Sequence, residues 1–123
     1  MNIEKMNNAA TILQEYKDFT SFSKLHGNAK TNLCDILKAY WVDDYNGELR
    51  FVITANRFLR NMVRAIVGTM IEIGLEKYPP ADIRRIILKK NRGAAGASAP
   101  PQGLYLAEIE YPKVPRYSVL KSV

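Results

Sequence analysis

The sequence predicts an α+β domain in which helices pack on one face of an antiparallel-rich sheet. Two strand-like runs, 33–45 and 48–57, flank Asn46-Gly47, a dipeptide that favours a two-residue type I′ hairpin turn. Helical patterns of apolar residues lie on both sides of this hairpin, at 6–16 and 58–71. Because a chain of 123 residues can bury one modest core, we expect a single domain at 1–112 and a surface tail at 113–123.

The amino-terminal elements are predicted from their apolar spacing. Apolar residues at helical intervals predict a short amphipathic helix over 6–16, with Asn7 or Asn8 able to cap its start. Phe19 and Phe22 are three residues apart and would share one face of the next helical turn, which indicates a core pair. The only histidine, His26, lies in an expected loop without any other metal-ligand residue at suitable spacing.

The remaining elements follow in order along the chain. Residues 48–57 alternate apolar and polar side chains, which predicts a strand with one buried face. The helix over 58–71 should stop at Gly74, and Pro80-Ala81-Asp82 should open another helix. Residues 91–103 form a long Gly/Ala/Pro-rich loop, which we expect to be functional, and 104–111 alternate like a last strand.

The helix that follows Pro80 carries a basic side, formed by Arg84, Arg85, Lys89 and Lys90. A solvated face and an RNA-facing surface explain this pattern equally well. The whole chain has 18 Lys and Arg against 12 Asp and Glu, a formal net charge of +6. That excess is suggestive of a polyanionic partner without identifying one.

The single cysteine, Cys34, excludes an intrachain disulfide and a cysteine-rich metal site. Its neighbours provide no base or cationic cluster, so we interpret it as a small buried hydrophobe in a reducing compartment. No apolar run approaches membrane-spanning length, and the amino terminus has no signal-like hydrophobic stretch. We therefore expect a soluble, cytoplasmic protein.

The motifs of common enzyme classes do not occur in this sequence. It has no phosphate-cradling Gly-Lys-Thr loop, no dinucleotide fingerprint and no Ser/His/acid set. The five aspartates fall at expected helix starts, strand edges or turns, where capping and solubility explain them. If the chain belongs to an enzyme, we expect an essential group to lie outside it.

Three arginines interrupt the apolar pattern of residues 56–68. Arg57, Arg60, Asn61 and Arg64 are spaced i, i+3, i+4 and i+7, which predicts one polar stripe on a helix. No acidic residue lies three or four positions from these arginines to neutralise them, so their charges would repel one another. A solvated face remains possible, but a phosphate or carboxylate facing the stripe fits guanidinium chemistry better.

Three segments carry a resemblance to a known family. Residues 56–68, NRFLRNMVRAIVG, resemble the F-L-x-x-M-V-R-x-I-V-G signature of the bacterial tRNA pseudouridine synthase A family. Residues 18–22, DFTSF, resemble its D-F-x-x-F element. Residues 97–106, ASAPPQGLYL, are similar to its T-A-P-A-x-G-L-x-L element, with Ser98 in place of threonine.

The resemblance implies the pseudouridine synthase fold, of which this chain would be a ferredoxin-like half. It also implies isomerisation of uridine in the tRNA anticodon arm, a homodimer, and no metal or organic cofactor. The family's catalytic aspartate lies in an R-T-D-x-G-V-H element, followed by a tyrosine that packs on the target base, and neither occurs here. The resemblance thus implies a carboxy-terminal half that is inactive by itself.

The resemblance also assigns site residues. The family's active-site arginine corresponds to Arg64, and the apolar residue that lines the target uracil corresponds to Leu104. Arg64 would pair with the catalytic aspartate and keep it ionised, while Arg57 and Arg60 would contact RNA phosphates. Two other functions fit the residues without the missing half: a non-catalytic RNA-binding α+β module, or a dimerisation domain.

Overall fold

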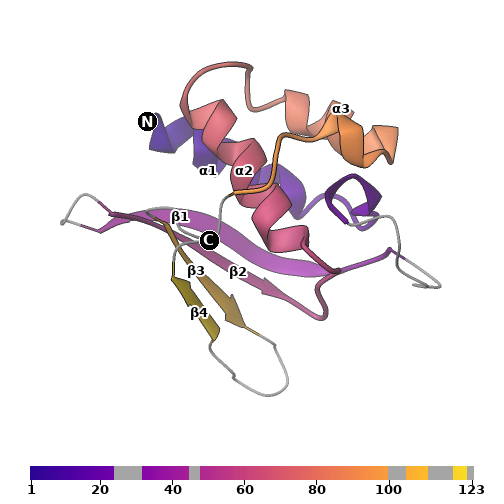
Figure 1. The fold of residues 1–123 in the computed structure, drawn as a ribbon, viewed down its shortest axis with the longest axis horizontal. Helices are drawn as coiled ribbons and strands as arrows, with labels where there is room; N and C mark the ends of the chain where they lie inside the picture. The colour runs from indigo at the N-terminus through magenta and orange to yellow at the C-terminus, as the bar shows by residue number, and fades with distance from the viewer. Residues whose placement is uncertain (24–31, 45–47, 100–104, 111–117, 122–123) are drawn as a thin grey trace.

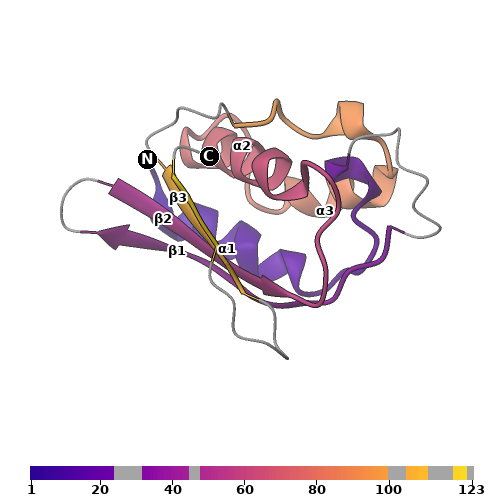
Figure 2. The same ribbon diagram turned by 60° about the horizontal axis from the view of Figure 1, so that its bottom comes forward.

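The computed structural model describes residues 1–23, 32–44, 48–99, 105–110 and 118–121. Within these ranges, a layer of helices covers one face of a four-stranded sheet (Figure 1). Turning the molecule shows the same two layers, with the helices on one side of the strands (Figure 2). The predicted α+β class and the packing of helices on one face are confirmed.

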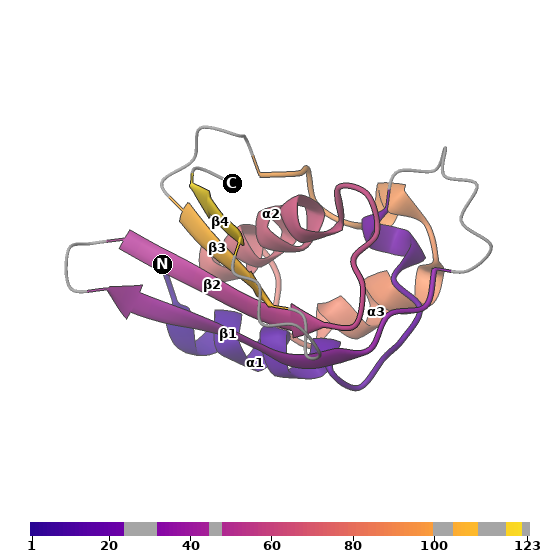
Figure 3. The same cartoon turned by 90° about the horizontal axis from the view of Figure 1, so that it is seen from below.

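The helical elements are α1 (Ile3–Leu13), η1 (Thr20–Phe22), α2 (Met62–Gly74), α3 (Asp82–Lys89) and η2 (Arg92–Ala94), of which η1 and η2 are short 3₁₀ turns. The strands are β1 (Ile36–Asp44), β2 (Glu48–Ala55), β3 (Tyr105–Glu110) and β4 (Ser118–Lys121). They lie in the sheet in that order, as is visible from below (Figure 3).

The predicted hairpin is present. β1 and β2 pair antiparallel from Ile36↔Ala55 to Asp44↔Glu48, whereas the Asn46-Gly47 turn lies outside the described residues. β2 and β3 pair parallel, and a parallel pair requires a crossover connection, which here contains α2 and α3. This crossover brings the residues after α3 back along α2 before the chain enters β3.

The core lies between the helices and the sheet. Trp41 and Phe51 stack with ring centroids 4.9 Å apart, and the indole Nε1 of Trp41 donates to Met70 Sδ at 3.0 Å. Phe19 and Phe22 are both fully buried, with ring centroids 6.4 Å apart, so the predicted aromatic core pair is confirmed. α3 adds its buried isoleucines, Ile83, Ile86 and Ile87.

The predicted start of the first helix was wrong. α1 begins at Ile3, and its cap is Asn2, whose side chain accepts a hydrogen bond from the Lys5 backbone N–H at 3.0 Å. Asn7 instead lies inside the helix and bonds the backbone of Trp41 through both its Nδ2 and its Oδ1. The amide serves to tie α1 to β1, a tertiary role that local capping preference cannot show.

The predicted helix over 58–71 was also wrong at its start. α2 begins at Met62, and Asn61 immediately before it has φ 64°, in the left-handed region, which a right-handed helix cannot include. Arg57 and Arg60 therefore precede the helix, and the predicted i, i+3, i+4, i+7 stripe does not exist. The apolar residues Phe58 and Leu59 fit the helical period because they pack on the core from an irregular segment.

Two further details differ from expectation in the sheet. Val52 and Thr54, on the face of β2 expected to be open, are buried because β2 is an internal strand with neighbours on both sides. β4 falls within 113–123, where we expected a tail, and it pairs antiparallel with β3. The division into a domain at 1–112 and a tail at 113–123 stays a prediction.

No helix in the described ranges is long and apolar enough to span a membrane.

Candidate functional site

The start of α2 and the segment that follows α3 form one structural unit. Residues 92–99, which we call the strap, run along α2 after the chain leaves α3 (Figures 1 and 2). The strap reaches the first turn of α2 at Arg64, where Ala99 is only 2% exposed. Two of the three segments that carry the family resemblance, 56–68 and 97–106, therefore meet here.

Arg64 is anchored to the strap by its side chain and by its backbone. Its Nε and Nη2 donate to the carbonyl of Ala99 at 3.0 and 2.9 Å, and the Ala99 N–H donates back to the carbonyl of Arg64 at 2.9 Å. Because two donors of one guanidinium meet a single oxygen, the plane of the guanidinium group is held in one orientation.

The outer edge of the Arg64 guanidinium bonds no group within the described part of the chain. There the side chain bonds only to Ala99, which leaves Nη1 and the outer N–H of Nη2 able to donate. These two nitrogens form an end-on edge whose geometry matches the two oxygens of a carboxylate or phosphate. Arg64 can thus receive an anion while it remains attached to the strap.

A second set of polar contacts lies beside Arg64. The hydroxyl of Ser98 accepts from Asn61 Nδ2 at 2.7 Å and from Arg92 Nη2 at 3.0 Å. Arg92 Nη1 also donates to the carbonyl of Gly96 at 2.9 Å. Asn61, which precedes α2, and Arg92, at the start of the strap, are therefore joined through one serine.

The middle of the strap lies directly against α2. A Cβ atom placed on Gly68 would be 1.8 Å from the carbonyl oxygen of Ala97, so only glycine allows this approach. At the next residue of α2, the N–H of Gly96 donates to Thr69 Oγ1 at 3.0 Å. The glycine that ends the NRFLRNMVRAIVG segment thus has a physical role as the contact point for the strap.

The other sequence-predicted site residues lie apart from this unit. Arg57 is half-buried and donates through Nη1 to the carbonyl of Leu33 at 3.2 Å, and Arg60 is exposed in the turn before α2. The structure does not place them on one helical face with Arg64. Leu104, the predicted uracil-lining residue, and His26 both lie outside the described residues.

Cys34 is 1% exposed and contacts Met62 Sδ at 3.9 Å, which confirms that it packs as a small hydrophobe. Burial raises the pKa of its thiol, an effect that the nearby charge of Arg57 only partly opposes. A thiol in this setting stays protonated and is a poor nucleophile. Among the described residues, no group of three His, Cys, Asp or Glu side chains is arranged to hold a metal ion.

The side chains of Asp18 and Asp35 both have partners within the chain. Asp18 accepts from the backbone N–H and the hydroxyl of Thr20 at 3.0 and 2.6 Å, and its carboxylate is 3.5 Å from Lys90 Nζ. Asp35 pairs with Lys17 at 2.9 Å. These contacts agree with the structural roles expected for the aspartates.

The basic side of α3 is largely neutralised from within the chain. Arg84 donates to both carboxylate oxygens of Glu15, at 2.6 and 3.0 Å, and this pair lowers the pKa of Glu15. Arg85 lies 3.6 Å from Asp82 in the same helix. Of the two open interpretations of this surface, these contacts favour a solvated face with internal ion pairs.

Sequence reasoning overlooked Arg92. Its signal was present, because it is the only charged residue between 91 and 103, in a segment otherwise composed of small residues, prolines and amides. A single arginine in a long loop of small residues has few partners except backbone carbonyls and hydroxyls. The structure shows that it bonds one of each.

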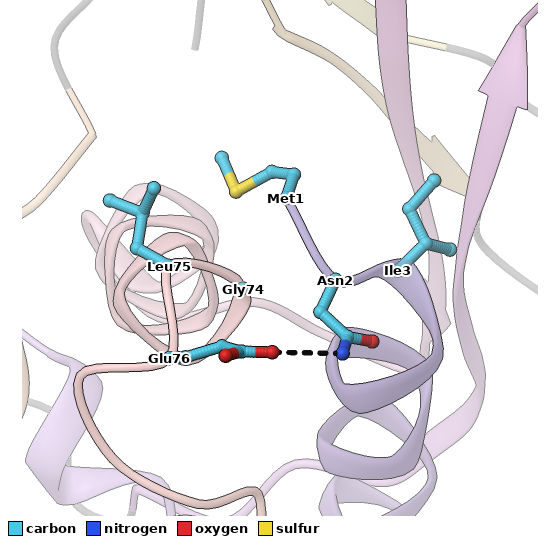
Figure 4. Close-up of a pocket in the computed structure, with 6 residues that line it drawn as sticks. All are labelled: Met1, Asn2, Ile3, Gly74, Leu75 and Glu76. Atoms are coloured by element: carbon cyan, nitrogen blue, oxygen red, sulfur yellow. Dashed lines mark hydrogen bonds between the residues drawn. The ribbon is translucent and has the colours of Figure 1, made fainter.

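A pocket lies at the other end of α2, away from Arg64 (Figure 4). It is lined by Met1, Asn2, Ile3, Gly74, Leu75 and Glu76. Its one carboxylate, that of Glu76, already accepts from Asn2 Nδ2 at 3.1 Å and pairs with Lys5 Nζ at 3.4 Å. The pocket therefore presents no group suited to chemistry, and the candidate site remains the junction of α2 and the strap.

Comparisons with known proteins agree with the sequence resemblance. The family model described as tRNA pseudouridine synthase matches residues 9–112. tRNA pseudouridine synthase A of Bacteroides fragilis is 51% identical over 113 residues, which cover 92% of this chain and 45% of that protein. The enzyme of the same name from Azobacteroides pseudotrichonymphae is 53% identical over 112 residues, 91% of this chain and 45% of its own length. That of Bacillus licheniformis is 40% identical over 111 residues, 90% and 44% of the two lengths. The chain thus spans about 45% of the relatives that it matches.

Proposed function

Because the chain belongs to the tRNA pseudouridine synthase family, we propose that it forms part of an enzyme that isomerises uridine to pseudouridine in the anticodon arm of tRNA. The observation that carries this proposal is Arg64, whose guanidinium is held by Ala99 on one edge and can donate from the other. The nucleophilic aspartate comes from the part of the enzyme that this chain does not contain.

The reaction explains why such an arginine is needed. Isomerisation breaks the bond between N1 of the base and C1′ of the ribose, forms a bond from C5 to C1′, and releases the C5 hydrogen as a proton while N1 takes up a proton. A carboxylate that acts as nucleophile must be ionised, whereas a partly buried carboxyl group tends to hold its proton. The open edge of Arg64 would stabilise the ionised form and orient its oxygens.

The RNA contacts follow from the surroundings of the site. Arg60 is exposed and Arg57 is half-buried in the segment before α2, and both would contact phosphates of the bound tRNA away from Arg64 itself. Contacts of this kind position RNA without reading its sequence. Leu104, which follows the strap, would line the pocket for a uracil that has been taken out of the base stack.

The remaining properties belong to the complete enzyme. It works as a homodimer in the cytoplasm, and it requires neither a metal ion nor an organic cofactor. The reduced, buried Cys34 is compatible with a cytoplasmic location. The charge of the chain, +6, suits a tRNA substrate.

Release of tritium from tRNA labelled at C5 of uridine tests the proposal. The full-length protein that contains this chain should release tritium and form pseudouridine in the anticodon arm. Arg64→Ala should lower kcat by about a hundredfold or more, because the nucleophile then loses its orientation and its counter-ion. Arg64→Lys should recover little, since an ammonium group cannot bond Ala99 and a carboxylate in one plane.

Lys5→Ala provides the matched control, because it also removes one positive charge but lies at the opposite end of α2, beside Glu76. Its turnover should equal that of the unmodified enzyme. Normal turnover by Arg64→Ala would refute the role assigned to Arg64. A full-length protein that releases no tritium from any tRNA would refute the activity itself.

A further inference from the structure

We propose that Arg92 is a positioning residue for Arg64: it holds the end of the strap so that the carbonyl of Ala99 fixes the Arg64 guanidinium. This inference rests on the proposed function, since positioning matters only if Arg64 takes part in the reaction. Arg92 itself bonds Gly96 and Ser98, whereas it is Ala99, the next residue, that bonds Arg64.

The geometry of Arg92 suits it to shape the strap. Its two terminal nitrogens donate to the carbonyl of Gly96 and to the hydroxyl of Ser98, at 2.9 and 3.0 Å. A planar guanidinium that bonds two points of one short segment restricts the backbone between them. Ala99 directly follows Ser98, so its backbone is restricted as well. Its carbonyl accepts from Nε and Nη2 of Arg64.

Asn61 links Ser98 to the start of α2 and does not cap the helix. A residue that precedes a helix commonly caps it by accepting from N–H groups of the first turn, but Asn61 makes no such bond. Its side chain instead donates to Ser98 at 2.7 Å, and its backbone adopts φ 64°. Departures from local preference at one point indicate that tertiary contacts dictate the arrangement.

Arg92 is not required to keep the strap on the helix. The close approach at Gly68 and the bond from Gly96 to Thr69 Oγ1 already attach the middle of the strap to α2. The contacts of Ser98 with Arg92 and Asn61 concern only the end that lies next to Arg64. Loss of Arg92 should therefore leave the fold intact and allow Ala99 and the Arg64 guanidinium to move.

Kinetics of the full-length enzyme provide the first test. Arg92→Ala should lower kcat by about ten- to a hundredfold, with KM for tRNA changed by less than about threefold, because misplacement of a reacting group affects mainly the chemical step. Arg92→Lys should fall in between, since one ammonium cannot reproduce both bonds. Lys5→Ala, at the far end of α2, is the charge-matched control and should retain full turnover. If Arg92→Ala fails to fold, Ser98→Ala removes the shared hydroxyl and should show a smaller loss of the same kind.

Coupling between the two arginines separates positioning from general stability. In an Arg64→Lys background, Arg92→Ala should reduce kcat by less than about twofold, because the group that it positions is already gone. If the two losses simply multiply, Arg92 does not act through Arg64 and the proposal is overturned. A kcat for Arg92→Ala equal to that of the unmodified enzyme overturns it equally.

The NMR signal of the Arg64 Nε–H, assigned by its disappearance in Arg64→Lys, gives a measurement that does not depend on activity. Its hydrogen bond to Ala99 predicts slow exchange with solvent, and Arg92→Ala should shift the signal and speed its exchange. If the full-length protein makes no pseudouridine while this response is seen, the proposed function fails and the link between the arginines stands. A signal that is unchanged in Arg92→Ala overturns the link, whatever the activity.

Discussion

Arg57, Arg60 and Arg64 are close in sequence, but the structure gives each of them different surroundings. Arg64 bonds the strap, Arg57 bonds the carbonyl of Leu33, and Arg60 is exposed. Their shared residue type therefore does not imply a shared role. In our proposal Arg64 serves the chemical step, whereas Arg57 and Arg60 serve binding.

This division predicts how salt affects tRNA binding by the full-length enzyme. Each phosphate contact that is removed should reduce the slope of log K against log[salt] by about 0.7 to 0.9. Arg60→Ala should show this change with kcat at saturating tRNA within about twofold of normal. Titrations at several salt concentrations measure the slope, and an unchanged slope would exclude a phosphate contact by Arg60.

The contacts of Asp18 predict that the free energy of unfolding falls at acidic pH. Burial raises the pKa of this carboxyl group, but the hydrogen bonds from Thr20 and the charge of Lys90 outweigh that effect, so its pKa in the folded chain is lowered. Since an unfolded aspartate has a pKa of about 3.9, the stabilisation is present above that pH and is lost as pH falls through the lower pKa of the folded chain.

Thermal unfolding from about pH 5 to pH 2 measures this loss. Asp18→Asn should weaken the dependence on pH in that range, because the titrating group is gone. Thr20→Ala removes the hydroxyl bond alone, so the pKa of Asp18 in the folded chain should rise towards its unfolded value. The loss of stability should then be smaller, and complete at a higher pH, than in the unmodified protein. Identical pH profiles for all three proteins would show that these bonds do not stabilise the ionised carboxylate.

At the scale of elements, the contact between the strap and α2 predicts whether Gly68→Ala raises or lowers the free energy of unfolding. Alanine favours helix over glycine by about 1 kcal/mol, so helix propensity alone predicts that Gly68→Ala stabilises the protein. The contact predicts the opposite, because the new methyl group would overlap the carbonyl of Ala97. We expect a net loss of roughly 1 to 3 kcal/mol in the free energy of unfolding, the usual cost of overpacking.

Gly93→Ala is the control for this substitution, because a Cβ atom there would meet only the Asn91 side chain, at 3.3 Å. Its effect should stay within about 0.5 kcal/mol, as for most surface changes. Urea unfolding of the two variants and the unmodified protein measures the difference. A Gly68→Ala protein that is more stable than the unmodified one would show that the strap can move away from α2 at little energetic cost.

The elements also show what the sequence could and could not predict. The hairpin and the helices were predictable because apolar spacing and turn residues are local signals. The start of α2 could not be predicted, because Phe58 and Leu59 have helical spacing although they pack on the core from an irregular segment. The left-handed backbone of Asn61 separates that segment from the helix. Arg64 was found from the family motif, but its bond to Ala99 depends on the crossover, which no local pattern reveals.

At the scale of the whole molecule, our proposal is that the chain provides one side of a site. It spans about 45% of the length of its relatives, and within the described residues no carboxylate bonds Arg64. We therefore expect the 123-residue chain alone to release no tritium from labelled tRNA. Co-expression with the remaining part of the enzyme should restore release, and the Arg64→Ala version of the same mixture should not. Tritium release by the chain alone would show that it contains its own nucleophile.

A crystal structure of the full-length enzyme tests the central claim most directly, since that claim concerns which atoms meet at Arg64. We predict that an aspartate from outside this chain lies with its carboxylate oxygens within about 3 Å of Nη1 and Nη2. Nε and Nη2 should at the same time remain bonded to the carbonyl of Ala99. An Arg64 whose outer edge faces a residue of this chain, or solvent with every aspartate distant, would contradict the account.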